Sequence, residues 1–138
     1  MYNKKVYIAE DQLIVALDIQ KTLKRICCDE ILMFRDIQSL FKTALSVPPD
    51  LIITELEINE NSNFRKSVET LTANQHTQFL LLSSYSPEDI QGDYQIPGCT
   101  ILSKPYSSDE LIKCLVKILN LPGSDRQLEN RQFTDFNN

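Results

Sequence analysis

Leu51-Ile52-Ile53-Thr54 is a short, largely apolar run near the middle of the chain. Pro48-Pro49 stands just before it and ends the preceding helical segment, because proline disrupts helical hydrogen bonding. Four other short apolar runs lie at 6–9, 31–34, 79–82 and 100–102. Strands of this kind are typically buried on both faces, so the runs predict a parallel sheet that helices cover on both sides.

Segments with helical spacing separate these runs. Residues 12–26 carry apolar side chains on one face, and residues 37–45 form the clearest helical pattern, with Asp36 as the expected N-cap. Apolar positions between 64 and 71 indicate a third helix. Strand and helical segments therefore alternate along the chain.

The remaining two helices are marked by their start signals. The segment 86–97 opens with Ser-Pro but contains a glycine and a second proline, so its helix should be short or irregular. Ser107 and Glu110 form a capping box ahead of a last helix that runs to Leu119. Five strand–helix units with right-handed crossovers predict a doubly wound α/β fold around a five-stranded parallel sheet.

Length and charge limit the classes of function. The chain has 138 residues, which suffices for one domain, expected at 1–120, with a polar tail or linker at 121–138. Lys and Arg number 14 against 19 Asp and Glu, and the net charge of −5 disfavours nucleic-acid binding and a polybasic membrane patch. Since no apolar run approaches the ~20 residues of a membrane span, no membrane contact is expected.

Cysteine, histidine and glycine usage excludes several kinds of site. The four cysteines include no C-x-x-C pair and the chain has one histidine, which disfavours a zinc site and a Ser-His-Asp hydrolase. Reduced thiols in a cytoplasmic protein are expected. With three glycines and no G-x-G-x-x-G or Walker loop, no organic cofactor is expected.

Charged side chains follow several of the predicted strands. Glu10-Asp11 follows the first run, Glu55 the third, Ser83-Ser84 the fourth and Lys104-Pro105 the fifth. The carboxyl ends of parallel strands meet at one edge of a doubly wound sheet, where ligands bind. Three carboxylates gathered there repel one another and need a cation, and Mg²⁺ suits such oxygen ligands.

These stretches resemble the receiver domain of two-component response regulators. The similarity rests on Lys5-Val-Tyr-Ile-Ala-Glu-Asp11, Pro49-Asp-Leu-Ile-Ile-Thr-Glu55, Leu80-Leu-Leu-Ser-Ser-Tyr85 and Leu102-Ser-Lys-Pro-Tyr106, and it spans residues 4–119. The resemblance implies a flavodoxin-like or CheY-like sandwich with strand order 2-1-3-4-5.

The resemblance also assigns roles by position. It places Mg²⁺ binding at Glu10, Asp11, Glu55 and the main-chain carbonyl of Glu57. It implies that Lys104 contacts phosphoryl oxygens, that Ser83 follows the phosphoryl group during switching, and that the Lys104–Pro105 peptide is often cis. The switch and phosphoryl-contact positions are Ser83, Ile101, Lys104 and Pro105.

The sequence departs from the family pattern at its centre. Glu55 stands where the phosphoacceptor aspartate is expected, and its extra methylene moves the carboxylate by on the order of 1 Å, which can cost ~10²-fold in rate. Ile101 replaces the usual aromatic residue, and the loop 57–63 lacks the usual proline and glycine. These departures predict that aspartyl phosphorylation is lost. Whether Glu55 mimics phosphorylation or is inert stays open.

The expected function is a non-enzymatic signalling module: an atypical receiver, independent of aspartyl phosphorylation, that acts through contacts with a sensor kinase or a downstream effector. The resemblance also allows a homodimer. One alternative is a conventional phosphorelay receiver that a histidine kinase phosphorylates despite Glu55. A further alternative from another class is an unrelated Mg²⁺-dependent phosphotransfer enzyme, which the absence of a Walker loop disfavours.

Overall fold

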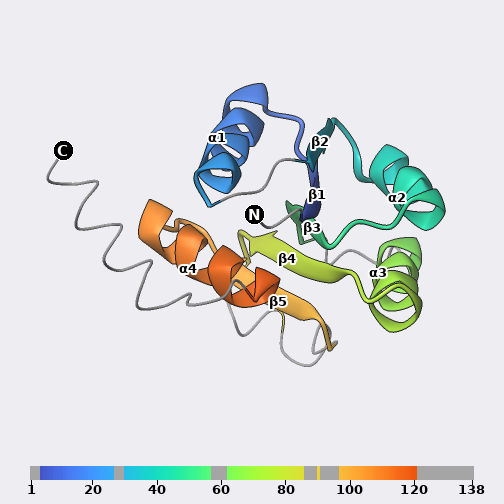
Figure 1. The fold of residues 1–138 in the computed structure, drawn as a ribbon. Coiled ribbons are helices and arrows are strands. Elements are labelled where there is room, and N and C mark those ends of the chain that lie inside the picture. Colours follow the sequence, from blue (N-terminus) through green and yellow to red (C-terminus); the bar gives the residue numbers. More distant parts are fainter. Residues whose placement is uncertain (1–3, 27–29, 57–61, 86–89, 91–96, 121–138) are drawn as a thin grey trace, which may run out of the picture.

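The computed structural model describes residues 4–26, 30–56, 62–85, 90 and 97–120, and within them strands and helices alternate (Figure 1). The strands are β1 (Lys5–Ala9), β2 (Glu30–Phe34), β3 (Leu51–Glu55), β4 (Gln78–Ser83) and β5 (Cys99–Ser103). The helices are α1 (Leu13–Arg25), α2 (Ile37–Ser46), α3 (Ser62–Asn74) and α4 (Ser108–Leu119). All five predicted strands are confirmed. The short helix expected within 86–97 and the tail at 121–138 lie outside the described residues, apart from Ile90 and Pro97.

The strands form one parallel sheet in the order β2-β1-β3-β4-β5, which confirms the predicted topology. The chain moves from β1 outward to β2 and then crosses back to β3 on the other side of β1. The strand order therefore reverses between β1 and β3. Ligands of doubly wound sheets bind beyond the carboxyl ends of the strands at such a point.

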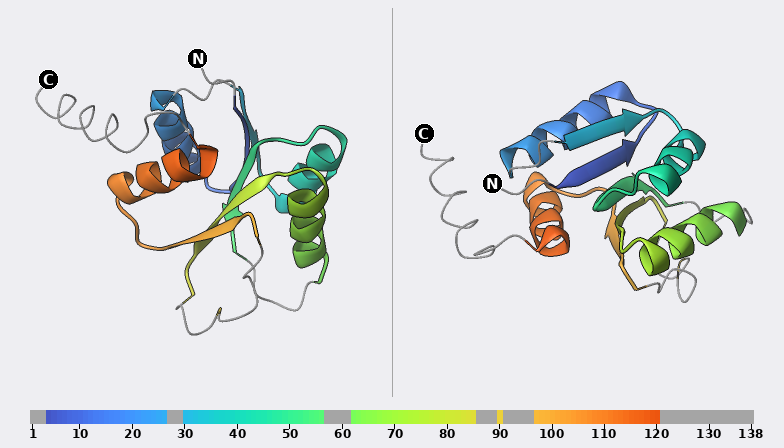
Figure 2. Two further views of the ribbon diagram at one scale, coloured as in Figure 1. Left: turned by 60° about the horizontal axis from the view of Figure 1, so that its bottom comes forward. Right: turned by 45° about the vertical axis from the view of Figure 1, so that its right-hand side comes forward.

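Helices cover both faces of the sheet, as Figures 1 and 2 show. One buried cluster joins α1 and α4 to the sheet and includes Ile19, Leu23 and Leu115. A second cluster, on the opposite face, joins α2 and α3 to it through Phe41 and Val68. The molecule is thus a three-layer sandwich with a separate apolar core on each face of the sheet.

The central strand β3 contributes side chains to both apolar cores. Leu51 and Ile53 belong to the α1/α4 cluster, whereas Ile52 belongs to the α2/α3 cluster, and all three are fully buried. Alternate residues of a strand point to opposite faces, so a run with no polar member up to Ile53 can fill two cores at once. This is why the sequence shows continuous apolar runs in place of alternation.

Side-chain caps begin two of the helices at the predicted residues. Asp36 accepts a 2.7 Å hydrogen bond from the backbone N–H of Ser39 at the start of α2. At α4, the Ser107 hydroxyl accepts from the backbone N–H of Glu110, and the Glu110 carboxylate accepts in return from the backbone N–H of Ser107, each at 3.1 Å. Both caps satisfy N–H groups that a helix cannot bond internally.

The cysteines and the helices bear on two further expectations. Cys99 and Cys114 are free thiols, while Cys27 and Cys28 lie outside the described residues. In the part of the chain that the structure describes, no helix has both the length and the apolar character needed to cross a membrane.

The Asp36 cap should make the stability of α2 depend on pH. The hydrogen bonds from Ser39 hold the pKa of the Asp36 carboxyl below its usual value. A lowered folded-state pKa contributes stability above the unfolded-state pKa, and this stability is lost as the pH falls through the folded-state value. We expect the melting temperature of Asp36→Ala to lie below that of the wild type at about pH 7, with a smaller difference at about pH 2.

Asp36→Asn is the matched control, since asparagine caps helices well and does not titrate. Its melting temperature, followed by circular dichroism, should exceed that of Asp36→Ala by the same amount at both pH values. An equal gap between wild type and Asp36→Ala at neutral and acidic pH would contradict the role of the ionised cap.

Candidate functional site

The predicted site residues lie at the carboxyl edge of the sheet, where backbone hydrogen bonds hold the strand ends in register. The N–H of Glu10 donates to the carbonyl of Phe34 at 3.0 Å, which ties the end of β1 to that of β2. The N–H of Lys104 donates to the carbonyl of Ser83 at 2.8 Å, which does the same for β5 and β4. Side chains separated by 94 positions in the chain are thereby brought to one edge (104 minus 10).

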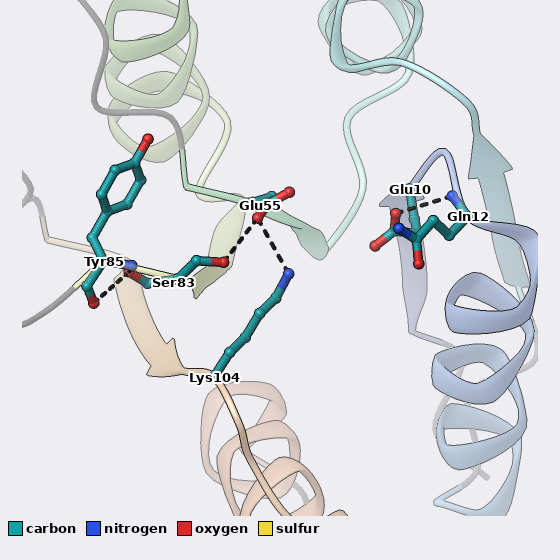
Figure 3. A network of polar contacts seen from close by, with 7 residues as sticks. Glu10, Gln12, Glu55, Ser83, Tyr85 and Lys104 are labelled. Carbon is teal, nitrogen blue, oxygen red and sulfur yellow. Dashed lines mark hydrogen bonds and ion pairs between the residues drawn. The ribbon is translucent and has the colours of Figure 1, made fainter.

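Glu55 and Lys104 form the central contact of this edge (Figure 3). The Lys104 Nζ lies 3.2 Å from the Glu55 Oε1. The hydroxyl of Ser84 donates to the same oxygen at 3.3 Å. The Lys104–Pro105 peptide is cis, as expected from the resemblance. The Glu55 carboxylate and the Lys104 ammonium group therefore contact each other directly.

Ser83 bonds to the backbone of a neighbouring residue, and its role in switching stays a prediction. Its side chain is fully buried, and its hydroxyl accepts the N–H of Tyr85 at 3.0 Å and donates to the carbonyl of Tyr85 at 3.3 Å. A serine can bond its neighbouring backbone in this way and so close a local turn. The hydroxyl that contacts Glu55 belongs instead to Ser84, which the sequence analysis did not single out. The tandem Ser83-Ser84 was the available signal, because consecutive residues at a strand end point in opposite directions and so cannot both face the same neighbour.

In the acidic pair Glu10-Asp11 after β1, the Glu10 carboxylate bonds to nearby backbone. Glu10 Oε2 accepts the backbone N–H of Gln12 at 3.1 Å, immediately before α1 (Figure 3). Burial raises the pKa of the Glu10 carboxyl, and the hydrogen bond and negative charge of Asp11 add to this rise. The Gln12 N–H and the positive charge of Lys104 act in the opposite direction. Glu10 is thus an acid whose proton affinity depends on both Asp11 and Lys104.

An open cavity of about 240 Å³ connects these acids. Its lining consists of Ala9, Glu10, Asp11, Arg35, Asp36, Ile37, Gln38, Thr54 and Glu55. Three predicted metal ligands therefore share one cavity. The cavity also contains Arg35, which the sequence analysis missed, because only the pairing of β1 with β2 places the residue after Phe34 beside Glu10.

The described acidic side chains fit Mg²⁺ only in part. Within the described ranges, no three acidic, histidine or cysteine side chains lie close enough together to hold a metal ion. Glu55 is bonded to Lys104 in place of joining the acidic pair. The fourth expected ligand, the carbonyl of Glu57, lies outside the described residues. A site with Glu10, Asp11, Glu55 and Glu57 all on one ion stays a prediction.

The other two predicted positions flank this edge. Ile101 is half-buried in β5 and packs against the α2/α3 cluster, so an apolar side chain occupies the expected aromatic position. Pro105 is exposed at the turn into α4.

The charges beside Glu10 predict opposite effects of two substitutions on the pKa of this carboxyl. Asp11→Asn should lower the pKa of Glu10, because it removes a neighbouring negative charge. Lys104→Met should raise that pKa further, because it removes a neighbouring positive charge. The measurement is a carboxyl carbon NMR titration, with the remote Lys117→Met as control. A Glu10 titration that neither substitution moves would contradict this account.

Comparisons with known proteins give structural matches. No protein-family model matches the sequence, and a search of curated proteins finds no match. A response regulator receiver protein from Sinorhizobium medicae has a TM-score of 0.69 at 17% identity, covering 86% of this chain and 95% of that one. The chemotaxis response regulator CheY4 of Vibrio cholerae has a TM-score of 0.68 at 21% identity, covering 85% and 99%. The isolated receiver domain of RcsB from Salmonella enterica has a TM-score of 0.69 at 21% identity, covering 92% and 99%. The chain therefore has the fold of response-regulator receiver domains.

Proposed function

We propose that this chain is a signalling receiver module in which Glu55 occupies the phosphoacceptor position permanently, so that it acts through protein contacts without aspartyl phosphorylation. The observation that carries the proposal is the 3.2 Å contact between the Lys104 Nζ and the Glu55 Oε1. The lysine assigned by resemblance to phosphoryl oxygens is bonded here to a carboxylate of the protein itself. The receiver fold supports the assignment of that lysine.

The chemistry of glutamate explains why phosphorylation would fail at this position. Phosphoryl transfer depends on alignment of the attacking oxygen, the phosphorus and the stabilising cations. The extra methylene of Glu55 carries its carboxylate toward Lys104, into the space that a phosphoryl group on a shorter aspartate would need. A displacement of about 1 Å can lower such a rate by ~10²-fold. The competing ion pair adds to this obstacle, because it must separate before the oxygen can attack.

The ion pair between Lys104 and Glu55 fixes the position of the lysine side chain more than it stabilises the fold. The side chains of Lys104 and Glu55 are 35% and 53% exposed, and exposed pairs contribute little to the free energy of unfolding. A carboxylate carries about one negative charge, whereas a phosphoryl group adds roughly −1.5 to −2. Glu55 would therefore hold Lys104 in one position without supplying the full charge of a phosphorylated aspartate. This favours a constant signalling state over a switched one.

Mg²⁺ is the ion that the receiver resemblance implies, and Glu10 and Asp11 are the described side chains that would hold it. Oxygen ligands of this kind suit Mg²⁺, which would neutralise the acidic pair. Because Glu55 is bonded to Lys104 and no three-ligand group is present among the described residues, binding should be weaker than in a pocket with three free carboxylates.

A surface for a protein partner adjoins the pocket. Leu13, Ile14 and Leu17 near the start of α1 are 64%, 84% and 45% exposed, although they are large and apolar. Exposed apolar side chains that gather on one surface commonly mark protein contacts. This surface begins two residues after Asp11, so a sensor kinase or downstream effector bound there would also lie next to the acidic pair.

Restoring the aspartate tests the proposal. We expect Glu55→Asp to gain the mass of one phosphoryl group when incubated with Mg²⁺ and acetyl phosphate, because the shorter side chain leaves room between its oxygen and Lys104. Wild type and Glu55→Gln should gain none. In the Glu55→Asp background, Lys104→Met should slow the gain by ~10²-fold, since it removes a cation from the transition state. Intact-protein mass spectrometry gives the readout.

Three other outcomes would contradict the proposal. A hydroxylamine-labile phosphoryl group on Glu55 of the wild type would overturn the proposal in favour of a conventional phosphorelay receiver. If Glu55→Asp folds but gains no mass, the pocket is not a receiver pocket. Transfer of a phosphoryl group from the protein to a small acceptor would instead indicate a phosphotransfer enzyme.

A further inference from the structure

Glu55 stands between two sets of partners at the carboxyl edge of the sheet. It is the last residue of β3, and β3 lies between β1 and β4. The acidic pair Glu10-Asp11 follows β1 on one side, whereas Ser84 and Lys104 follow β4 and β5 on the other. Neighbouring strands are only ~4.8 Å apart, so a glutamate side chain can turn to either side. Its direction therefore decides whether the acidic pair gains a third carboxylate.

In the structure, the Glu55 side chain is turned toward the ends of β4 and β5 (Figure 3). Its Oε1 accepts the hydroxyl of Ser84 at 3.3 Å and lies 3.2 Å from the Lys104 Nζ. Figure 3 shows Glu10 well apart from this contact. Glu10 and Glu55 nevertheless line one open cavity of about 240 Å³. A Glu55 carboxylate turned toward β1 would thus reach the space that Glu10 already lines.

Ser84 is a fixed partner, because hydrogen bonds hold the chain on both sides of it. The carbonyl of Ser83 accepts the N–H of Lys104 at 2.8 Å, which ties the residue before Ser84 to the end of β5. The buried hydroxyl of Ser83 accepts the N–H of Tyr85 at 3.0 Å, which closes the turn around Ser84. A serine hydroxyl is separated from the backbone by a single carbon. The Ser84 hydroxyl therefore cannot follow Glu55 toward β1.

Lys104 is the more adaptable partner of Glu55. Its ammonium group ends a flexible four-carbon stem, and the side chain is 35% exposed. Burial raises the pKa of Glu10, and the positive charge of Lys104 opposes this rise, so the lysine also acts on a carboxylate of the β1 side. Lys104 could therefore accompany Glu55 to either side. The ion pair ties Lys104 to Glu55, whereas the Ser84 hydroxyl ties Glu55 to a fixed point of the backbone.

We propose that Ser84 is a positioning residue that turns Glu55 toward Lys104 and so withholds the Glu55 carboxylate from Mg²⁺. Without the Ser84 hydroxyl, Glu55 can turn toward Glu10 and Asp11 and supply a third carboxylate. Mg²⁺ prefers oxygen ligands, and its charge offsets the repulsion between neighbouring carboxylates. Ser84 thus selects between an internal ammonium group and an external divalent ion as the cation that Glu55 contacts. This selection rests on the function proposed above, which places Glu55 at the acceptor position of a receiver pocket.

Loss of the Ser84 hydroxyl should strengthen Mg²⁺ binding, which is opposite to the effect of structural damage. A substitution that only disturbed the strand ends would move the ligands apart and weaken binding. Ser84 is exposed, so alanine at this position leaves no buried cavity. A hydrogen bond to a charged group can change an equilibrium about tenfold or more, and exposure to solvent reduces this effect. We therefore expect an increase in affinity of at least about threefold.

Titration of the full chain with MgCl₂ tests this expectation. The dissociation constant is obtained from backbone amide NMR shifts near Glu10 and Asp11, at constant ionic strength because salt screens the charges. Ser84→Ala should bind Mg²⁺ at least about threefold more tightly than the wild type. Ser84→Thr keeps the hydroxyl and should bind like the wild type. Ser103→Ala, which changes another exposed serine of this edge, should do the same.

A double substitution shows whether the gain passes through Glu55. In a Glu55→Gln background, Ser84→Ala should leave the affinity for Mg²⁺ unchanged, because the amide cannot act as a third anionic ligand. Binding by Ser84→Ala that is equal to the wild type, weaker or too weak to measure would overturn the proposal. A gain that persists with Glu55→Gln, or that Ser84→Thr or Ser103→Ala shares, would overturn it as well.

The side-chain carboxyl carbon of Glu55 gives a second readout. In Ser84→Ala, Mg²⁺ should move its NMR resonance together with those of Glu10 and Asp11. A Glu55 resonance that Mg²⁺ leaves in place would overturn the proposal. The phosphorylation test of Glu55→Asp leaves Ser84 unchanged. Its failure would reject the receiver pocket, whereas a failed Mg²⁺ titration would reject the role of Ser84 alone.

Discussion

Burial of β3 on both faces, with β1 and β4 bonded to its two edges, is the constraint on which the rest of the structure depends. Leu51, Ile52 and Ile53 are fully buried, and their side chains belong to two different apolar clusters. A strand buried in this way needs helices above and below it, and parallel neighbours require crossover connections. The same registers bring the ends of β1, β3, β4 and β5 to one edge. The site is therefore a consequence of how the core is filled.

At that edge, the acidic side chains bond to donors of the protein itself. Glu55 contacts Lys104 and Ser84, and Glu10 accepts the N–H of Gln12. A receiver pocket with a free aspartate would be ready for a cation and a phosphoryl group, whereas this pocket is partly neutralised without either. The proposed role as a constant signalling module follows from that difference. It agrees with the receiver fold and does not require the phosphorylation chemistry.

Two regions of the sheet differ in character. The switch point between β1 and β3 holds the polar cavity, and the edge strand β2 carries the exposed side chains of Leu32 and Met33. Arg35 follows the last residue of β2 and lines the cavity, so it belongs to both regions.

The strands, the described helices and their order could be predicted from the sequence, because they depend on short-range patterns. Apolar runs gave the strands, Asp36 and Ser107 marked helix starts, and the spacing of Glu10, Glu55 and Lys104 relative to strand ends predicted a shared edge. Which atoms meet at that edge depends on the packing of the folded chain and could not be predicted from the sequence. That Ser84 and not Ser83 contacts Glu55, and that Arg35 enters the cavity, depends on side-chain direction and strand pairing. The exposure of Leu32 and Met33 likewise depends on β2 being an edge strand, since the run Ile31–Phe34 is as apolar as one that is buried on both faces.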